Sequence, residues 1–210
     1  MELSEIFYSL QGESSYVGLP CVFVRLAGCN LRCSYCDTTY AYEPEFSLSV
    51  EEIILEVKKY LPVKLVEITG GEPLLQGDLV HLMNRLIEDD YSLLLETNNS
   101  ITLKDVPKQV IKIVDFKTPS SVMSDRMLWD NVKYFNEKDE LKFVVADRQD
   151  FEWGIHVIEK YNLHRFQLLF SPVFDKLDVT KLADWILETK LSIRLNVQLH
   201  KLLWEDKRGK

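Results

Sequence analysis

Residues 28–38 read Gly-Cys-Asn-Leu-Arg-Cys-Ser-Tyr-Cys-Asp-Thr, so Cys29, Cys33 and Cys36 follow one another in the spacing C-x3-C-x2-C. Three thiolates can bind three irons of a 4Fe-4S cluster and leave the fourth iron open for another ligand. The remaining cysteine, Cys21, lies in the apolar run Cys-Val-Phe-Val, where a buried and unreactive thiol is expected. The spacing therefore favours an iron–sulfur cluster with an open coordination site.

Two other uses of these cysteines remain open from the spacing alone. A structural zinc site needs four ligands, and the fourth would come from Cys21 or from one of the four histidines. The histidines are scattered at positions 81, 156, 164 and 200 and form no closely spaced pair. A disulfide would leave one of the three thiols over, and nothing in the sequence indicates an oxidising compartment. The cluster is the prediction, with zinc or a chance spacing as the alternative.

A second stretch, residues 66–74, reads Val-Glu-Ile-Thr-Gly-Gly-Glu-Pro-Leu, which predicts a strand that runs into a glycine pair. Gly70 and Gly71 lack a Cβ, so their backbone can approach a ligand closely, and Pro73 fixes the exit from the turn. The cysteine motif, followed by a strand that ends in G-G-E-P, resembles the radical S-adenosylmethionine (SAM) superfamily. The resemblance implies that SAM binds the open iron and hydrogen-bonds to the backbone of the glycine pair.

The composition is that of an ordinary globular chain. Of its 210 residues, 46% are hydrophobic and 28% charged, and the formal net charge is -8. This length predicts one domain that covers residues 1–210. The acidic charge and the lack of a basic block argue against binding to nucleic acid. No signal peptide and no apolar run of about 20 residues is visible, so we expect a cytoplasmic protein without a membrane segment.

Apolar strands and amphipathic helices alternate along most of the chain. The expected strands, which are nearly continuous apolar runs, cover residues 21–26, 65–69, 92–96, 111–116, 140–145, 165–170 and 193–197. The expected helices cover residues 49–60, 77–89, 125–135, 148–161 and 179–189. Such alternation is typical of a parallel sheet covered by helices, and about six βα units are too few for a closed eight-fold barrel. We predict an α/β fold, namely an open or partial (β/α)6 barrel with a short N-terminal extension.

Polar segments follow five of the predicted strands, at the edge where parallel α/β sheets carry their functional residues. They cover residues 28–38, 70–72, 96–98, 115–117 and 171–172, and we expect them to lie around one rim. Polar residues at strand ends are also common helix caps, and for Asp37, Asn98 and Ser171 taken singly that interpretation stays open. Arg25 is the one charge in its apolar strand, so it faces either water at an edge or a functional site.

Six motifs narrow the resemblance to one family. The motifs are residues 6–13 (IFYSLQGE), 23–31 (FVRLAGCNL), 36–38 (CDT), 69–73 (TGGEP), 95–98 (LETN) and 199–204 (LHKLLW), and they resemble those of 7-carboxy-7-deazaguanine synthases. Ser14 and Asn99 depart from the pattern, because the family commonly has glycine at both positions. Asparagine tolerates a left-handed backbone conformation, so Asn99 can replace glycine. The change at Ser14 leaves open which path the substrate-binding loop takes. The Lys-Arg-Gly-Lys ending also differs from members that stop soon after the His-Lys pair.

The resemblance implies a lyase that converts 6-carboxy-5,6,7,8-tetrahydropterin to 7-carboxy-7-deazaguanine and releases ammonia, on the route to queuosine and archaeosine. It further implies a homodimer that receives electrons from flavodoxin or ferredoxin and uses a 4Fe-4S cluster, SAM and Mg²⁺. The implied site residues are Cys29, Cys33 and Cys36 for the cluster, Thr38 for Mg²⁺, Leu10, Gln11, Gly12, Arg25 and Thr69 for the substrate, and Gly71, Asp115, Phe116, Lys117, Ser171, Pro172, Val173 and Phe174 for SAM. Two alternatives are a different radical SAM enzyme, such as a glycyl-radical activase, and a non-catalytic metal-binding module.

Overall fold

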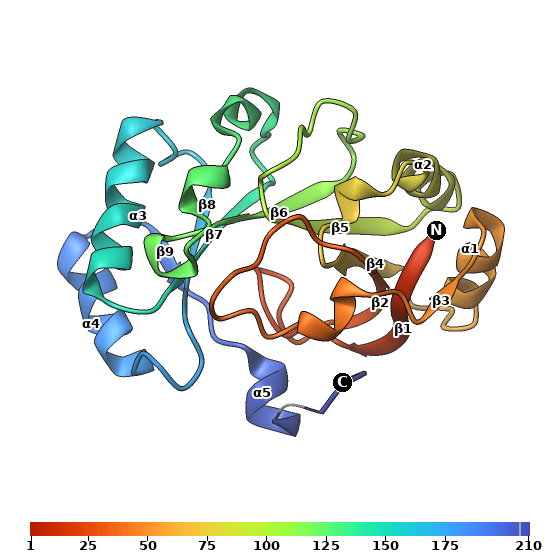
Figure 1. Ribbon diagram of the computed structural model, residues 1–210, viewed down its shortest axis with the longest axis horizontal. Coiled ribbons are helices and arrows are strands. Elements are labelled where there is room, and N and C mark those ends of the chain that lie inside the picture. Colours follow the sequence, from red (N-terminus) through yellow and green to blue (C-terminus); the bar gives the residue numbers. More distant parts are fainter. Residues whose placement is uncertain (206) are drawn as a thin grey trace.

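The computed structural model describes residues 1–205 and 207–210. In this part of the chain, nine strands form one sheet in the order β3-β1-β2-β4-β5-β6-β7-β8-β9 (Figure 1). β1 (Glu2–Leu10) lies antiparallel between β2 (Pro20–Leu26) and the short β3 (Phe46–Ser47), and each neighbouring pair from β2 to β9 is parallel. Because β3 and β9 are the two edges, the sheet does not close. The predicted open partial barrel is therefore confirmed, and its N-terminal extension is β1.

The parallel strands follow the apolar runs of the sequence, each within two residues of its predicted ends. After β2 they are β4 (Leu65–Gly70), β5 (Ser92–Thr97), β6 (Ile111–Phe116), β7 (Glu140–Val145), β8 (Gln167–Pro172) and β9 (Ile193–Leu195). In β2 the successive residues Val22, Phe23 and Val24 are all buried, so both faces of the strand are covered. This is why the run reads as continuously apolar rather than alternating.

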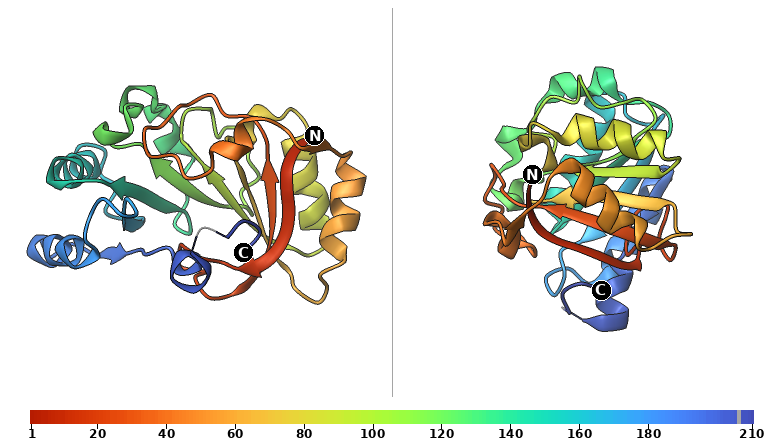
Figure 2. Two further views of the ribbon diagram at one scale, coloured as in Figure 1. Left: turned by 60° about the horizontal axis from the view of Figure 1, so that its bottom comes forward. Right: turned by 90° about the vertical axis from the view of Figure 1, so that its right-hand side faces the viewer.

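Four helices of the crossover connections pack on the sheet. They are α1 (Val50–Lys58), α2 (Leu79–Glu88), α3 (Arg148–Lys160) and α4 (Val179–Thr189). α1 begins at a capping box, in which Ser49 Oγ accepts from the Glu52 N–H at 3.3 Å and the Glu52 carboxylate accepts from the Ser49 N–H at 2.8 Å. α1 and α2 share one apolar core with β2, β4 and β5, and α3 and α4 share a second with β6, β7 and β8 (Figure 2).

The predicted helix over residues 125–135 is wrong. Two 3₁₀ segments, η4 (Ser124–Arg126) and η5 (Trp129–Tyr134), stand in its place. The buried amide of Asn131 bonds to the loop after β5, donating to the Ile101 carbonyl oxygen at 2.8 Å and accepting from the Leu103 N–H at 3.0 Å. Trp129 stacks on Tyr161 with ring centroids 4.4 Å apart. These long-range contacts hold the segment in short turns, which overrides its helical pattern of apolar residues.

A last helix, α5 (Leu199–Trp204), was not predicted. It lies beside the N-terminal strand rather than with the outer helices, as Figure 2 shows, and the Leu199 N–H donates to the Gly12 carbonyl oxygen at 2.8 Å. The C-terminal residues after it reach the same strand, where Arg208 Nε lies 3.2 Å from Glu5 Oε2. The two ends of the sequence therefore meet on one side of the sheet. None of the described helices combines the length and apolar character that a bilayer span requires.

Candidate active site

The cysteine loop leaves the carboxyl end of β2 and is fastened to its surroundings by backbone hydrogen bonds. The Gly28 N–H donates to the Ala41 carbonyl oxygen at 2.8 Å, and the Ser34 N–H donates to the Ser121 carbonyl oxygen at 3.1 Å. The thiols of Cys29, Cys33 and Cys36 are free and partly exposed on this loop. The loop is thus held at both halves, while its sulfur atoms stay accessible.

The donor set of this loop fits an iron–sulfur cluster. All three thiols line one cavity, and burial raises the pKa of Cys29 and of Cys33, while the nearby charge of Lys117 lowers it. Iron binds the thiolate form, so the cation favours the form that ligation requires. Among the described residues no three His, Cys, Asp or Glu side chains converge on a single metal ion. A cluster instead takes one thiolate per iron, which matches three sulfurs spread along a loop.

Cys21 is separated from these thiols and is completely buried in β2. Burial raises the pKa of its thiol far above the usual value, and the charge of Glu67 adds to the rise. A thiol that stays protonated is a poor metal ligand. Cys21 is therefore a core residue, as its apolar neighbours in the sequence predict.

The glycine pair after β4 lies against the cysteine loop. The Gly71 N–H donates to the Leu26 carbonyl oxygen at 3.1 Å, and the Glu72 N–H donates to the Gly28 carbonyl oxygen at 2.8 Å. A Cβ built on Gly71 would lie 2.7 Å from the carbonyl carbon of Gly28 and 2.8 Å from Cys29 Cβ. Closeness to the cluster loop is thus one reason for glycine here, beside the predicted approach to a ligand.

Glu72, the acid of the G-G-E-P turn, is fully buried and fastens the end of β5 to this turn. Its carboxylate accepts from the Thr97 hydroxyl at 2.9 Å, from the Asn98 N–H at 2.7 Å and from the Leu74 N–H at 3.0 Å. Burial raises the pKa of Glu72 to about 7, against the opposing effect of these donors. The G-G-E-P motif draws attention to Glu72, but Glu72 does not line the cavity. Its carboxyl group connects the turn after β4 to the end of β5.

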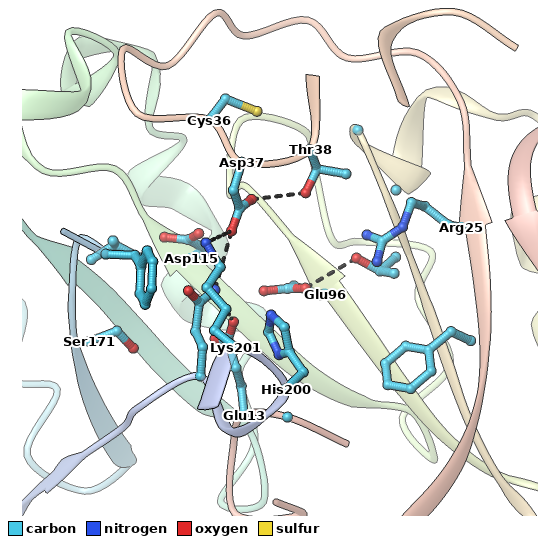
Figure 3. Close-up of a pocket in the computed structure, with 18 of the residues that line it drawn as sticks. Glu13, Arg25, Cys36, Asp37, Thr38, Glu96, Asp115, Ser171, His200 and Lys201 are labelled. Carbon is cyan, nitrogen blue, oxygen red and sulfur yellow. Dashed lines mark hydrogen bonds and ion pairs between the residues drawn. The ribbon is translucent and has the colours of Figure 1, made fainter. Parts of the chain in front are cut away.

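A cavity of about 790 Å³ lies on this rim and is lined by residues from distant parts of the chain (Figure 3). The predicted site residues that line it are Leu10, Gln11, Gly12, Arg25, Cys29, Cys33, Cys36, Thr38, Thr69, Gly71, Asp115, Lys117, Ser171, Pro172, Val173 and Phe174. Parallel strands explain this convergence, because their carboxyl ends all meet at the same edge of the sheet.

Phe116 is the predicted site residue that the cavity does not include. Its side chain is completely buried on the other face of β6, where it stacks on Phe143 at 5.2 Å and on Trp129 at 5.7 Å between ring centroids. Side chains alternate between the faces of a strand, so Asp115 and Lys117 face the cavity while the residue between them faces the core. The side chain of Phe116 therefore does not line the cavity, and the predicted contact with SAM is left to its backbone.

The loop after β1 forms one wall of the cavity. Gln11 Nε2 donates to the buried carboxyl of Glu67, and Gln11 Oε1 accepts from the Glu13 N–H at 2.9 Å. Burial raises the pKa of Glu67 well above its usual range, and the charges of Glu96 and Glu13 add to this. A Cβ on Gly12 would lie 3.0 Å from Cγ of His200, so glycine is what allows α5 to close on this loop.

Arg25 reaches the cavity from β2. Its Nε donates to Glu5 Oε1 at 2.8 Å, and the Tyr40 hydroxyl donates to the same oxygen at 2.9 Å. Among the described residues only Nε of this guanidinium has a hydrogen-bond partner, which leaves both Nη groups for a ligand. The alternative of an edge residue facing water is wrong, because Arg25 lines the cavity and its side chain is 17% exposed.

Asp37 and Thr38 end the cysteine loop on the same side of the cavity as α5. The Thr38 hydroxyl donates to Asp37 Oδ1 at 2.9 Å, while Gln198 Nε2 donates to Asp37 Oδ2 at 3.2 Å and Lys201 Nζ lies 3.7 Å from it (Figure 3). Thr38 precedes the 3₁₀ turn η1 (Thr39–Tyr42), but its hydroxyl makes no capping hydrogen bond. The simple helix cap is thus not the role of this side chain.

Several residues of the cavity were not predicted as site residues. They are four acids, a lysine, an amide and an imidazole, namely Glu5, Glu13, Glu67, Glu96, Lys142, Gln198 and His200. The sequence does indicate two of them, because Glu67 and Lys142 are charged residues within apolar strands. A buried charge needs a partner or a function. Which residues would pair could not be read from the sequence, because the partners lie far apart along it.

Comparison with known proteins agrees with this geometry. The model of the radical SAM superfamily matches residues 24–122. The structure resembles the crystal structure of QueE from Escherichia coli, with a TM-score of 0.78 and 23% identity over 94% of this chain and 93% of that chain. It also resembles Streptococcus suis SuiB bound to S-adenosylmethionine, with a TM-score of 0.62 and 16% identity over 87% of this chain and 54% of that chain. The fold and the cysteine loop together define a radical SAM enzyme, which carries a 4Fe-4S cluster and uses SAM.

Full-length relatives specify the family. The chain is 43% identical to the 7-carboxy-7-deazaguanine synthase of Koribacter versatilis, over 97% of both chains. It is 42% identical to the synthase of the same name from Chlorobaculum tepidum, over 100% of this chain and 97% of the relative. It is 33% identical to that of Thermoplasma acidophilum over the whole of both. The chain therefore belongs to the 7-carboxy-7-deazaguanine synthase family, which sets aside the glycyl-radical activase and the non-catalytic module.

Proposed function

We propose that this enzyme converts 6-carboxy-5,6,7,8-tetrahydropterin to 7-carboxy-7-deazaguanine with loss of ammonia, a step in the biosynthesis of 7-deazapurines such as the precursors of queuosine and archaeosine. The observation that carries the proposal is one cavity lined both by the cysteine loop and by the predicted substrate residues, of which Gln11 and Arg25 present polar groups. Relatives over the full length of the chain bear the name of this synthase.

The cluster and SAM supply, when bound, the radical that starts the reaction. Cys29, Cys33 and Cys36 hold the cluster, and the backbone at Gly71 lies beside them. SAM takes the cavity wall formed by Asp115 and Lys117, whose carboxylate and ammonium are paired at 2.7 Å, and by residues 171–174. The protein's own task is to orient both ligands and to keep water from the reacting atoms.

The substrate takes the opposite wall, which consists of residues 10–12, Arg25 and Thr69. The Arg25 guanidinium is a planar and permanently charged fork that suits the substrate carboxylate. The Thr69 hydroxyl donates to Glu96 Oε2 at 3.1 Å, so its orientation is fixed before a ligand arrives. Such preorganisation reduces the entropy that ordering would cost on binding.

The test of this proposal is anaerobic turnover of 6-carboxy-5,6,7,8-tetrahydropterin with SAM and a chemical reductant. We expect formation of 7-carboxy-7-deazaguanine and release of ammonia in equal amounts, and neither with the Cys33→Ala variant. Wild-type protein that holds a full cluster and cleaves SAM, yet leaves the pterin unchanged, would contradict the proposed substrate.

We further propose that the protein works as a single domain within a homodimer in the cytoplasm and receives its electrons from a flavodoxin or ferredoxin. What supports this is the family to which the chain belongs. Sedimentation of the anaerobic protein measures the oligomeric state. Turnover with each purified donor in place of the chemical reductant measures the electron source.

Arg25→Lys is expected to impair turnover of the pterin much more than binding of SAM. Lysine keeps the positive charge and the pairing with Glu5, but its ammonium cannot reproduce the bidentate geometry of the guanidinium. The measurement is kcat/KM for the pterin beside the dissociation constant for SAM, both under anaerobic conditions. Equal losses in the two quantities would mean that Arg25 only supports the strand.

Thr38 is proposed to bind Mg²⁺ through its hydroxyl, with the substrate carboxylate and waters as further ligands. Magnesium prefers octahedral oxygen ligands and keeps several waters, so one protein hydroxyl and a substrate carboxylate suffice. We expect Mg²⁺ to raise turnover of chelator-treated enzyme, and Thr38→Val to lose most of this response while it keeps the cluster and SAM binding. Binding of Mg²⁺ and of substrate should also strengthen each other reciprocally. A Thr38→Val variant that responds to Mg²⁺ as fully as wild type would contradict the Mg²⁺ role. The hydroxyl would then serve only its hydrogen bond to Asp37.

A further inference from the structure

Lys142 is a buried cation on β7 at the floor of the cavity. Its side chain is 7% exposed and lies in a strand whose neighbouring residues Leu141 and Phe143 are completely buried. An ammonium group taken out of water is costly unless carboxylates pair with it. Burial lowers the pKa of Lys142, but the charges of Glu13 and Glu96 raise it well above the usual value, so this lysine stays charged.

Carboxylates from three separate segments surround this ammonium. Lys142 Nζ lies 2.9 Å from Glu13 Oε2 on the loop after β1, 2.5 Å from Glu96 Oε1 at the end of β5, and 4.0 Å from Asp115 Oδ2 on β6. Asp115 has a closer cation of its own, since Lys117 Nζ lies 2.7 Å from it. The two carboxylates in direct contact with Lys142 are therefore those of Glu13 and Glu96.

Glu96 and Glu13 are both connected to the wall assigned to the substrate, Glu96 through its carboxylate and Glu13 through its backbone. Glu96 Oε2 accepts from the Thr69 hydroxyl at 3.1 Å, and the Glu13 backbone N–H donates to Gln11 at 2.9 Å. Glu13 Oε1 also accepts from Gln198 Nε2 at 2.8 Å, which connects the same acid to the start of α5. Lys142 thus lies where three segments come together on the substrate side of the cavity. They are the loop after β1, the end of β5 and the start of α5.

We propose that Lys142 is a positioning residue of the reaction, which holds the carboxylates of Glu13 and Glu96 together so that the substrate wall keeps its shape and charge. The inference rests on the proposed function, because it assigns the pterin to this wall. Lys142 itself acts through the two carboxylates and through the residues they orient.

Lys142 lies among several carboxylates, and its positive charge reduces the repulsion between them. The charged or titratable groups around this floor include Glu13, Glu67, Glu96, Asp115, Lys117, Arg25, Asp37, His200 and Lys201. Burial raises the pKa of Glu96, yet the charge of Lys142 brings it below the usual value. Without that charge, the carboxylates of Glu13, Glu67 and Glu96 would repel one another, and Glu67 and Glu96 would lose their protons only at higher pH.

The test compares Lys142→Met with Lys142→Arg and with a matched control, Lys112→Met. Lys112 is also buried, with a side chain 3% exposed, and pairs with Asp139 at 2.8 Å, but it does not line the cavity. We expect Lys142→Met to lose about 10- to 100-fold in kcat/KM for the pterin, as displaced supporting groups do elsewhere. The acidic limb of its pH profile should move to higher pH, while cluster content and SAM affinity stay near wild type. In Lys142→Arg the acidic limb of the pH profile should return most of the way to its wild-type position. Lys112→Met should lower the melting temperature without changing kcat/KM or the pH profile.

A second measurement does not depend on the substrate. In the oxidised, substrate-free protein with ¹³C-labelled glutamate, we expect a carboxyl resonance that titrates at higher pH in Lys142→Met than in wild type or Lys112→Met. Unchanged carboxyl titrations in a folded Lys142→Met variant would overturn the inference, as would a wild-type kcat/KM for the pterin in that variant. Failure of the wild type to bind the pterin while the titrations shift as expected would count against the proposed substrate only.

Discussion

Cys29→Ala, Cys33→Ala and Cys36→Ala are each expected to abolish both cluster assembly and turnover. Each thiolate is one of only three protein ligands on the loop, and no spare thiol lies within it. The measurement is iron and sulfide content with the visible absorbance after anaerobic reconstitution, followed by turnover. Melting temperatures of the metal-free variants should stay near that of the metal-free wild type, because backbone hydrogen bonds and the side chains of Ser34 and Tyr35 fasten the loop without the three thiols.

Cys21→Ala is the matched control for this series. Its side chain is completely buried in β2, so the substitution removes one sulfur from the core and costs about 1 kcal/mol of stability or somewhat more. The cluster and the activity should remain. A Cys21→Ala variant that folds normally but binds no iron would overturn the assignment of the three loop cysteines as the complete protein ligand set.

The rim could be predicted from the sequence because it depends on rules that act locally. Continuous apolar runs predict parallel strands, and polar residues after those runs must then share one edge. Gly71, Asp115 and Ser171 were placed in this way, and all of them line the cavity. The fold prediction failed where tertiary contacts decide, as over residues 125–135, where the buried side chain of Asn131 overrides a helical pattern.

The cavity floor could not be predicted, because its pairing partners lie far apart in the sequence. Lys142 pairs with Glu13 across 129 residues and with Glu96 across 46. A single charge in an apolar strand indicates that some partner exists, yet it does not specify which one. The same limit applies to α5, whose six residues are too few to form a helix without the contact to Gly12.

The two departures from the family pattern have a backbone explanation. Ser14 has φ of 65° and Asn99 has φ of 60°, both in the left-handed region that glycine adopts most easily. The Ser14 N–H donates to Asn196 Oδ1 at 2.9 Å, and Asn99 Oδ1 accepts from Asn131 Nδ2 at 2.9 Å. Hydrogen bonds therefore support both residues in a conformation that glycine adopts most easily.

Gly71→Ala is expected to reduce cluster occupancy strongly and to lower stability by about 1–3 kcal/mol, the usual range for overpacking a filled site. The added methyl would lie 2.7 Å from the carbonyl carbon of Gly28 and 2.8 Å from Cys29 Cβ. Neither neighbour is the flexible end of a side chain, so the methyl fits only if the backbone that carries a cluster ligand moves. Iron content after reconstitution and the melting temperature measure the two effects.

Gly77→Ala separates this clash from the general effect of replacing glycine. A Cβ at Gly77 would meet no heavy atom within 4 Å, and this glycine is not among those with a positive φ. Alanine there restricts the unfolded chain without strain, so we expect a stability change within about 1 kcal/mol and a full cluster. The Gly71→Ala variant distinguishes two roles of Gly71, namely room for the cysteine loop and close approach to SAM. Loss of iron would show that the added methyl displaces the cysteine loop. Retention of all iron with weaker SAM binding would instead assign Gly71 to the ligand alone.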